Sequence, residues 1–205
     1  MIAVIDYGIG NVRSVLNAFE YIGAQAVLTR DYAELAKASG LVLPGVGAFG
    51  EGMRRLNLYD LCEPLTASVR AGKPLLGICL GFQMLMRSST EQGHHGGLLV
   101  INHDVVRLPV DARLPHIGWS KVRAIADAPT APQLLAGLDN ELFYFVHSYG
   151  LVNPAQPVVG GTATYGGCEI IALIESGNVF GTQFHPEKSG EAGLRMLRNF
   201  WKLCR

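Results

Sequence analysis

Cys79 stands in the stretch LLGICLGFQML, residues 75–85, where an apolar run gives way to a pattern typical of a helix. Gly77 and Gly81 flank it, each two residues away. A tight turn between a strand and a helix crowds the backbone, needs such small neighbours, and exposes the side chain at its apex. A thiol placed there lies at the positive end of the helix dipole, which favours the nucleophilic thiolate. The pattern therefore predicts a nucleophilic cysteine, or a buried structural one if the glycines are incidental.

A base for such a thiol is offered by the stretch GTQFHPEKS, residues 181–189. The proline after His185 biases it toward an extended backbone, where residues two apart share a face, so we expect His185 and Glu187 to project together. A carboxylate beside an imidazole fixes its tautomer and stabilises the imidazolium. His147 in YFVHSYG is the rival base, but no carboxylate is near it in the sequence, which favours a role in a pocket wall. Cys79, His185 and Glu187 therefore make a candidate triad for acyl transfer.

The stretch LPGVGAFGEG, residues 43–52, has glycines on both sides of Val46 directly after an apolar run. Such a loop turns backbone N–H groups toward a ligand. We interpret it as part of an oxyanion hole in which the N–H of Val46 acts with that of Leu80. Because Gly45 has no Cβ, the peptide before Val46 rotates easily, which predicts a switch. A phosphate-binding loop is the competing interpretation, although neither GK[ST] nor GxGxxG occurs here.

Alternating strands and helices in the first eighty residues are expected to position these groups. Strands are predicted at 2–6, 25–29, 41–44 and 74–78, and helices at 12–22, 31–38 and 61–71. This order implies a parallel sheet covered by helices on both faces. The expected fold class is therefore α/β, a three-layer sandwich with a mostly parallel central sheet, in one domain spanning residues 1–205.

The second half of the chain predicts added antiparallel strands. Its apolar stretches follow one another closely, and turn signals separate them, such as YGG before Cys168 and SGN before Val179. A closing amphipathic helix is expected to turn one side to the core. The residues on that side are Leu194, Leu197, Trp201 and Cys204.

The bulk composition excludes several classes of protein. Lys and Arg total 17, as do Asp and Glu, so the net charge is zero and no nucleic-acid or anionic-membrane surface is predicted. No apolar run reaches the roughly 18 residues that cross a bilayer, and the N-terminus has no basic leader. The four cysteines are widely spaced and form no CxxC pair, which is typical of a reduced, cytoplasmic protein. No metal site is expected from the histidines, whose spacing matches no ligand set.

Taken together, these motifs resemble the triad type of class I glutamine amidotransferases. GICLGFQ is similar to the nucleophile motif of that family, and FHPE to its His-Glu motif. More narrowly, the chain resembles the glutaminase subunits of imidazole glycerol phosphate synthase nearly end to end. The stretches that narrow the resemblance are DYGIGN, PGVGAFGEGM and PHIGW.

The resemblance implies hydrolysis of L-glutamine through a glutamyl thioester on Cys79, with His185 as acid and base and Glu187 orienting it. It implies no cofactor. Positions that match glutamine-binding residues of the family are Gly47, Gln83, Glu91, Ser148 and Tyr149. Positions on the side that faces a partner are Arg13, His116 and Trp119. The switch predicted at the peptide before Val46 adds a further expectation: docking of the partner, with its acceptor bound, would activate the glutaminase.

The implied partner is a cyclase subunit with a β/α-barrel fold, held in a heterodimer. It would receive the ammonia directly and form imidazole glycerol phosphate and an aminoimidazole carboxamide ribonucleotide in histidine biosynthesis. Four positions are atypical for the family, and all lie outside the triad: Leu99, Asn102, His103 and Ser120. The runner-up is the same chemistry supplying ammonia for amidation of a surface sugar. A stand-alone thiol hydrolase and an inactive scaffold are the alternatives from other classes.

Overall fold

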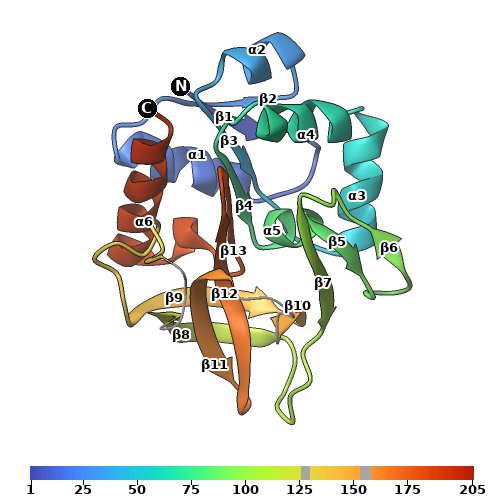
Figure 1. Ribbon diagram of the computed structural model, residues 1–205, viewed down its shortest axis with the longest axis vertical. Helices are drawn as coiled ribbons and strands as arrows, with labels where there is room; N and C mark the ends of the chain where they lie inside the picture. Colours follow the sequence, from blue (N-terminus) through green and yellow to red (C-terminus); the bar gives the residue numbers. More distant parts are fainter. Residues whose placement is uncertain (126–129, 153–157) are drawn as a thin grey trace.

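A parallel sheet forms the centre of the molecule (Figure 1). The computed structural model describes residues 1–125, 130–152 and 158–205. Adjacent parallel strands follow the order β2 (Ala26–Thr29), β1 (Ile2–Ile5), β3 (Gly40–Leu43), β4 (Leu75–Ile78) and β13 (Val179–Thr182). Most of these runs are buried along their whole length, as expected of strands covered on both faces.

Helices cover both faces of this sheet, so the predicted three-layer arrangement is confirmed. The alternation along β1 shows the two faces: Ile2 and Val4 belong to one apolar cluster, and Ala3 and Ile5 belong to the other. The first cluster includes side chains of α1 (Val12–Tyr21) and α6 (Gly190–Leu203). The second includes side chains of α2 (Tyr32–Lys37), α3 (Phe49–Leu58), α4 (Cys62–Arg70) and α5 (Leu80–Met84).

The second half of the chain extends the sheet with mostly antiparallel strands, as the sequence predicts. β12 (Cys168–Ser176) pairs with β13, and the sheet continues through β10 (Tyr149–Val152), β7 (Ile101–Arg107), β5 (Met86–Ser89) and β6 (His95–Gly96). The pair of β5 with β7 is parallel. A further branch joins β11 (Val159–Tyr165), β8 (His116–Ala124) and β9 (Glu141–His147) (Figure 1).

Two helices differ from their predictions. The glycine-rich stretch interpreted only as a loop continues into α3, which the sequence pattern hid because Gly50 and Gly52 are poor helix formers. Both glycines lie where α3 meets its neighbours: a Cβ on Gly52 would stand 2.6 Å from the sulfur of Met84. In α6, Leu197 is buried as expected, as is Cys204 directly after the helix, whereas Leu194 and Trp201 are half-buried. The centre of its core face is instead formed by Met196 and Phe200.

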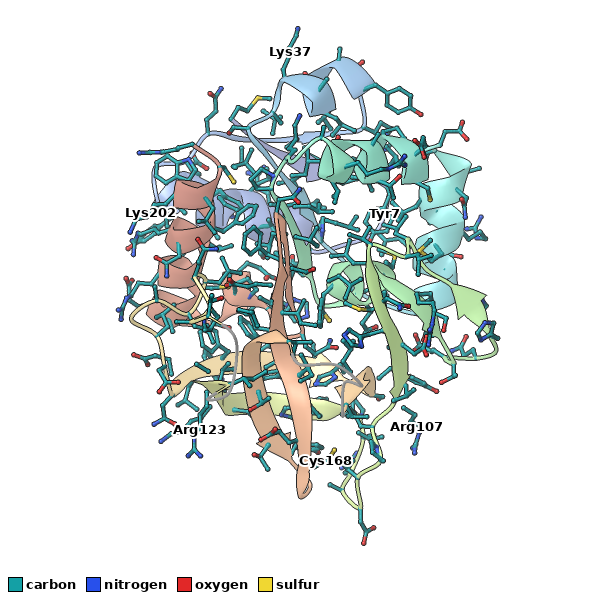
Figure 2. The ribbon with its side chains drawn as sticks, in the orientation of Figure 1. Tyr7, Lys37, Arg107, Arg123, Cys168 and Lys202 are labelled. Atoms are coloured by element: carbon teal, nitrogen blue, oxygen red, sulfur yellow. The ribbon has the colours of Figure 1, made fainter. Side chains whose placement is uncertain are left out.

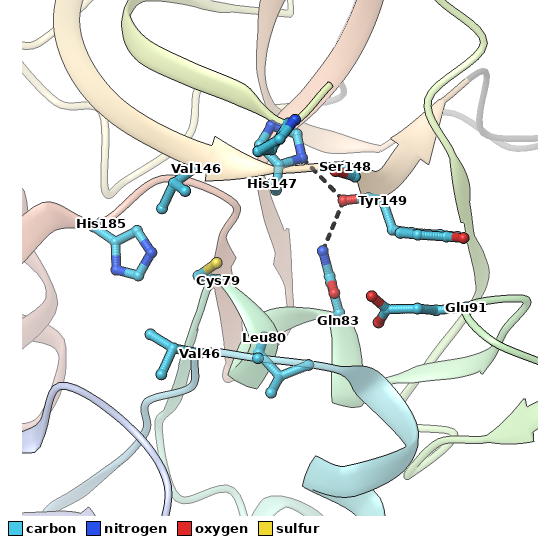
Figure 3. Close-up of a pocket in the computed structure, with 12 residues that line it drawn as sticks. Val46, Cys79, Leu80, Gln83, Glu91, Val146, His147, Ser148, Tyr149 and His185 are labelled. Carbon is cyan, nitrogen blue, oxygen red and sulfur yellow. Dashed lines mark hydrogen bonds between the residues drawn. The ribbon is translucent and has the colours of Figure 1, made fainter. Parts of the chain in front are cut away.

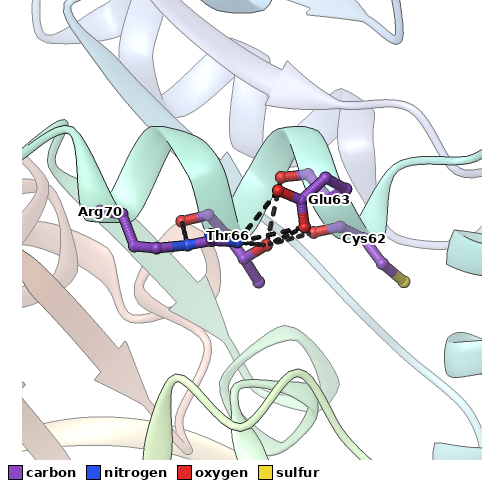
Figure 4. A network of polar contacts seen from close by, with 4 residues as sticks. All are labelled: Cys62, Glu63, Thr66 and Arg70. Atoms are coloured by element: carbon purple, nitrogen blue, oxygen red, sulfur yellow. Dashed lines mark hydrogen bonds and ion pairs between the residues drawn. The ribbon is translucent and has the colours of Figure 1, made fainter.

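Charged side chains project from the outside of the molecule, while Tyr7 is fully buried (Figure 2). On α4, Arg70 contacts Glu63 at 3.0 Å beside Thr66 (Figure 4), and both charged side chains are more than half exposed. Such a pair contributes less than about 1 kcal/mol to stability. All four cysteines are free thiols. No helix in the described part of the chain is both long and apolar enough to cross a membrane.

Candidate active site

Three neighbouring parallel strands bring the candidate groups to one edge of the sheet. Because β3, β4 and β13 run in the same direction, their carboxyl ends lie together, where open α/β sheets bind ligands. The loop that begins at Pro44 follows β3, Cys79 follows β4, and His185 is the third residue after β13. Val46, Cys79 and His185 line one cavity of about 220 Å³ (Figure 3).

Cys79 occupies a sharp turn between β4 and α5. Its φ is 52° and its ψ is −107°, a backbone conformation that side-chain-bearing residues rarely adopt. Its backbone N–H donates to the carbonyl of Thr182 at 2.7 Å, which ties the turn to β13. A Cβ on Gly81 would stand 1.8 Å from the carbonyl oxygen of Leu43. The glycine is therefore required for α5 to approach β3, and the thiol is buried yet lines the cavity.

We expect Gly81→Ala to lower the free energy of unfolding by about 3 kcal/mol, because an overpacked contact with backbone has no flexible side chain to move. Urea denaturation of the purified chain measures this value. Gly96→Ala is the matched control, since a Cβ there meets no atom within 4 Å. Equal unfolding midpoints for the two variants would show that the turn relaxes without cost.

His185 and Glu187 are in contact: the Nδ1 of His185 lies 2.8 Å from a carboxylate oxygen of Glu187. Both side chains are only 1% exposed. The prediction of an extended segment is wrong beyond His185, because Pro186 begins a short 3₁₀ helix, Pro186–Lys188. The turn still brings the two side chains together, since His185 itself is extended, with φ −99° and ψ 96°. The hydroxyl of Ser189 donates to the His185 carbonyl at 2.6 Å and fixes this turn.

The electrostatics of His185 favour its charged form. Burial opposes protonation of the ring, but the side chains of Cys79 and Glu187 outweigh burial and raise the pKa of His185 to about 10. The ring thus carries its proton at neutral pH and places a cation beside the cavity. Its Nε2 is buried and has no hydrogen-bond partner among the described residues. That nitrogen is the one available to a bound substrate.

The loop after β3 is held at both ends. The hydroxyl of Tyr7 donates to the carbonyl of Pro44 at 2.7 Å, and the backbone N–H of Phe49 donates to the Glu91 carboxylate at 2.7 Å. Burial, with a smaller effect from Cys79, raises the pKa of Tyr7, so its hydroxyl keeps the proton that it donates. Val46, between these two attachments, is 37% exposed. The free part of the loop is therefore residues 45–48.

A polar wall faces the cavity on the side away from His185 in Figure 3. It contains four of the positions that match glutamine-binding residues, namely Gln83, Glu91, Ser148 and Tyr149, and the fifth, Gly47, also lines the cavity. The side-chain N–H₂ of Gln83 is already used: it donates to the Tyr149 carbonyl at 2.8 Å and to the side-chain oxygen of Gln183 at 3.0 Å. Only the oxygen of that amide remains to face a ligand.

His147 lines the cavity, as the sequence interpretation placed it, and no carboxylate bonds to it among the described residues. Burial lowers its pKa to about 4, so the ring is neutral. Its Nδ1 lies 2.9 Å from the Tyr149 carbonyl and its Nε2 lies 3.2 Å from the Nδ1 of His116. These contacts make His147 part of a structural network and leave His185 as the stronger candidate base.

The three positions predicted to face a partner lie in different surroundings. Arg13 on α1 and Trp119 on β8 are exposed, Trp119 by 53%. His116 is only 2% exposed, and its ring stacks between Phe145 and Tyr165. Successive residues of a strand point to opposite faces, so His116 and Trp119, an odd number apart, cannot share one. The position of His116 does not support direct contact with a partner.

The sequence interpretation missed three residues at the site. Pro115 and Val146 line the cavity, and Gln183 lies 3.7 Å from the sulfur of Cys79. The available signal was an amide, Gln183, directly after an apolar strand, because an amide that is buried there needs hydrogen-bond partners. No group of three or more His, Cys, Asp or Glu side chains within residues 1–125, 130–152 and 158–205 is arranged to hold a metal ion.

Comparisons with known proteins agree with this geometry. The family model for class-I glutamine amidotransferases matches residues 3–203. The imidazole glycerol phosphate synthase subunit HisH of Methanothermobacter thermautotrophicus is 50% identical over 205 residues, which is 100% of both chains. HisH of Bacillus cereus is 43% identical, over 100% of this chain and 99% of that protein.

Solved structures share the fold. PurLQS from Thermotoga maritima matches 100% of this chain and 98% of its own, with a TM-score of 0.72 at 20% identity. The glutaminase domain of Trypanosoma brucei CTPS with bound acivicin matches 98% of this chain and 93% of its own, with a TM-score of 0.67 at 15% identity. With the sequence relatives, these findings establish that the chain belongs to the class-I glutamine amidotransferases and, among them, to the HisH family of imidazole glycerol phosphate synthase subunits.

Proposed function

We propose that this chain hydrolyses L-glutamine at Cys79 and delivers the ammonia to a cyclase partner. The observation that carries the proposal is the meeting of Cys79, in its strained turn, with the buried pair of His185 and Glu187 at one cavity. A thiol, a base and a carboxylate so arranged perform acyl transfer through a covalent intermediate.

The thiolate of Cys79 attacks the carboxamide carbon of glutamine, and the carbonyl oxygen becomes an oxyanion. His185 gives its proton to the amide nitrogen, so that ammonia leaves and a glutamyl thioester remains. The neutral ring then takes a proton from water, which attacks the thioester and releases glutamate and the thiolate. Glu187 stabilises the imidazolium in both half-reactions and holds the ring through Nδ1.

Two backbone groups are proposed to stabilise the oxyanion. Leu80 is the first residue of α5, so its N–H has no partner within that helix. The second donor is the N–H of Val46. Tyr7 holds the Pro44 carbonyl and Glu91 holds the Phe49 N–H, so rotation is confined to the peptides between these attachments. This arrangement supports a switch at the peptide between Gly45 and Val46.

The substrate is proposed to be held by the polar wall. Glu91 keeps one carboxylate oxygen on Phe49 and offers the other, Oε1, to the α-ammonium group of glutamine. The oxygen of the Gln83 amide, together with Ser148 and Tyr149, completes the wall, and Gly47 lines the same cavity. A cavity of about 220 Å³ with a carboxylate on its wall suits a small zwitterion better than the acyl group of a peptide.

The partner is proposed to be the β/α-barrel cyclase that forms imidazole glycerol phosphate and the aminoimidazole carboxamide ribonucleotide in histidine biosynthesis. The similarity to HisH subunits of imidazole glycerol phosphate synthase supports this choice over sugar amidation. We propose that it docks on the β8–β9 patch, which consists of Ile117, Trp119 and Leu142. These side chains are 60%, 53% and 46% exposed. Val146, paired with Ile117, lines the cavity, so the patch adjoins the site where ammonia forms.

We expect glutaminase turnover to be low for the chain alone and to rise on adding the cyclase, and again on adding its acceptor ligand. Val46→Pro should assemble but lose about 10²–10³ of this stimulated rate, because it lacks one oxyanion donor. Glutamate release measures turnover, and size-exclusion chromatography checks assembly. Val46→Ala is the matched control, since it keeps the N–H and should retain most of the response.

Equal turnover in all three conditions would contradict the switch while leaving the chemistry in place. Hydrolysis of small peptide esters without any hydrolysis of glutamine would overturn the proposed function itself and favour the stand-alone hydrolase.

A further inference from the structure

Gln183 is a fully buried amide behind the nucleophile, and the chemistry described above does not use it. It directly follows β13, and its backbone N–H is bound to the carbonyl of Ala172 at 2.8 Å. Its Nε2 lies 3.7 Å from the sulfur of Cys79, and its Oε1 lies 3.0 Å from the Nε2 of Gln83. A buried amide with both ends engaged is held in one orientation.

The Tyr149 carbonyl determines that orientation. A carbonyl oxygen only accepts, so the Gln83 group that meets it at 2.8 Å must be the N–H₂. The second hydrogen of this N–H₂ then points at Gln183, which must present its oxygen. The N–H₂ of Gln183 is therefore left to face Cys79, with the sulfur as acceptor.

His147 bonds to the same Tyr149 carbonyl, and His116 bonds in turn to His147, so neither ring changes the orientation of the Gln83 and Gln183 amides. His147 donates to Tyr149 from Nδ1, so its Nε2 accepts from the Nδ1 of His116 at 3.2 Å. The remaining nitrogen of His116 accepts from the hydroxyl of Ser120 at 2.9 Å. Burial lowers the pKa of each ring to about 4, so both histidines stay neutral. Each donor and acceptor in this hydrogen-bond network therefore keeps its role. Figure 3 shows the two bonds that converge on Tyr149.

We propose that Gln183 is a positioning residue for the nucleophile: its N–H₂ donates to Cys79 and holds the sulfur in one rotamer toward the cavity. The expected effect of Gln183 on glutamine hydrolysis rests on the proposed function. The backbone of Cys79 is fixed by its bond to Thr182, which still leaves the side chain three staggered positions. A donor on one side selects among them, and a donated hydrogen bond is stronger to the thiolate than to the thiol.

The test compares Gln183→Met, which has a similar length and no N–H, with the wild-type chain. Iodoacetamide labelling at neutral pH, mapped to Cys79 by mass spectrometry, should slow about tenfold, because the lost bond was made to a charged acceptor. In the assembled complex the kcat for glutamine should fall by a similar factor while KM changes by less than about twofold, since the bond acts on the nucleophile and not on binding. Gln25→Met, the same change at an exposed position, should leave labelling and kcat unchanged.

Gln83→Met is the second variant, and it keeps the inference testable if Gln183→Met does not fold. It removes the donor that orients Gln183 and should also slow labelling, though less than Gln183→Met. Labelling of either folded variant at the wild-type rate would overturn the inference. Labelling needs no glutamine, so an inactive wild-type chain would contradict the proposed function while the comparison of labelling rates still decides the role of Gln183.

Discussion

Replacing Cys79 with alanine is expected to reduce glutamine hydrolysis by about 10⁴-fold or more, because a covalent mechanism loses its nucleophile. The alanine also removes only one buried sulfur, so the fold should be retained. Glutamate release by the chain assembled with its cyclase is the measurement. Circular dichroism of the variant verifies the fold.

Supplying ammonium salt provides the internal control for this variant. The cyclase reaction of the assembled complex should proceed with ammonia as nitrogen source, because the substitution affects only its production. Cys62→Ala, which changes a half-buried cysteine on α4, should keep full glutaminase activity. Substantial glutamate release by a clean Cys79→Ala preparation would disprove the thioester mechanism.

His185→Asn is expected to reduce the glutaminase rate by about 10²–10⁴-fold, since proton transfer to the leaving nitrogen and from water both depend on this ring. His147→Asn should have a smaller effect, because His147 is neutral and its two nitrogens already serve the network around Tyr149. Initial rates at saturating glutamine compare the two. A fully active His185→Asn beside an inactive His147→Asn would reverse the assignment of the base.

Glu187→Gln extends the same experiment to pH. Glu187 is one of the two groups that raise the pKa of His185, so its neutral replacement should lower that pKa. The rate that depends on protonated His185 is present below its pKa and lost above it, and the alkaline limb of the profile should therefore move to lower pH. We expect the effect at the optimum to be smaller than that of His185→Asn. An alkaline limb at the same pH in Glu187→Gln and wild type would show that Glu187 does not raise the pKa of His185.

Local sequence patterns were enough to predict the candidate groups that the structure brings together at the cavity. Glycines on both sides of an apolar run indicated Cys79, and a histidine two residues before a carboxylate indicated His185 and Glu187. The backbone after His185 is a 3₁₀ turn and not the expected extended segment. Gln183 escaped notice because its importance comes from Gln83, a hundred residues away in the chain. The burial of His116 follows from strand alternation, which a motif comparison does not consider. The helix α3 was not predicted because it contains Gly50 and Gly52, which allow close packing but are poor helix formers.

The last strand of the chain lies inside the sheet, and this has a consequence for synthesis. β13 inserts between β4 and β12, although about a hundred residues separate it from β4. During translation β4, the strand that precedes Cys79, therefore has one unpaired edge until β13 is made, and an unpaired edge can pair wrongly. A nascent chain that ends before residue 179 also lacks His185, Glu187 and Gln183, so its thiol has neither base nor donor. We therefore expect turnover of glutamine to begin only in a chain whose β13 has been made and inserted.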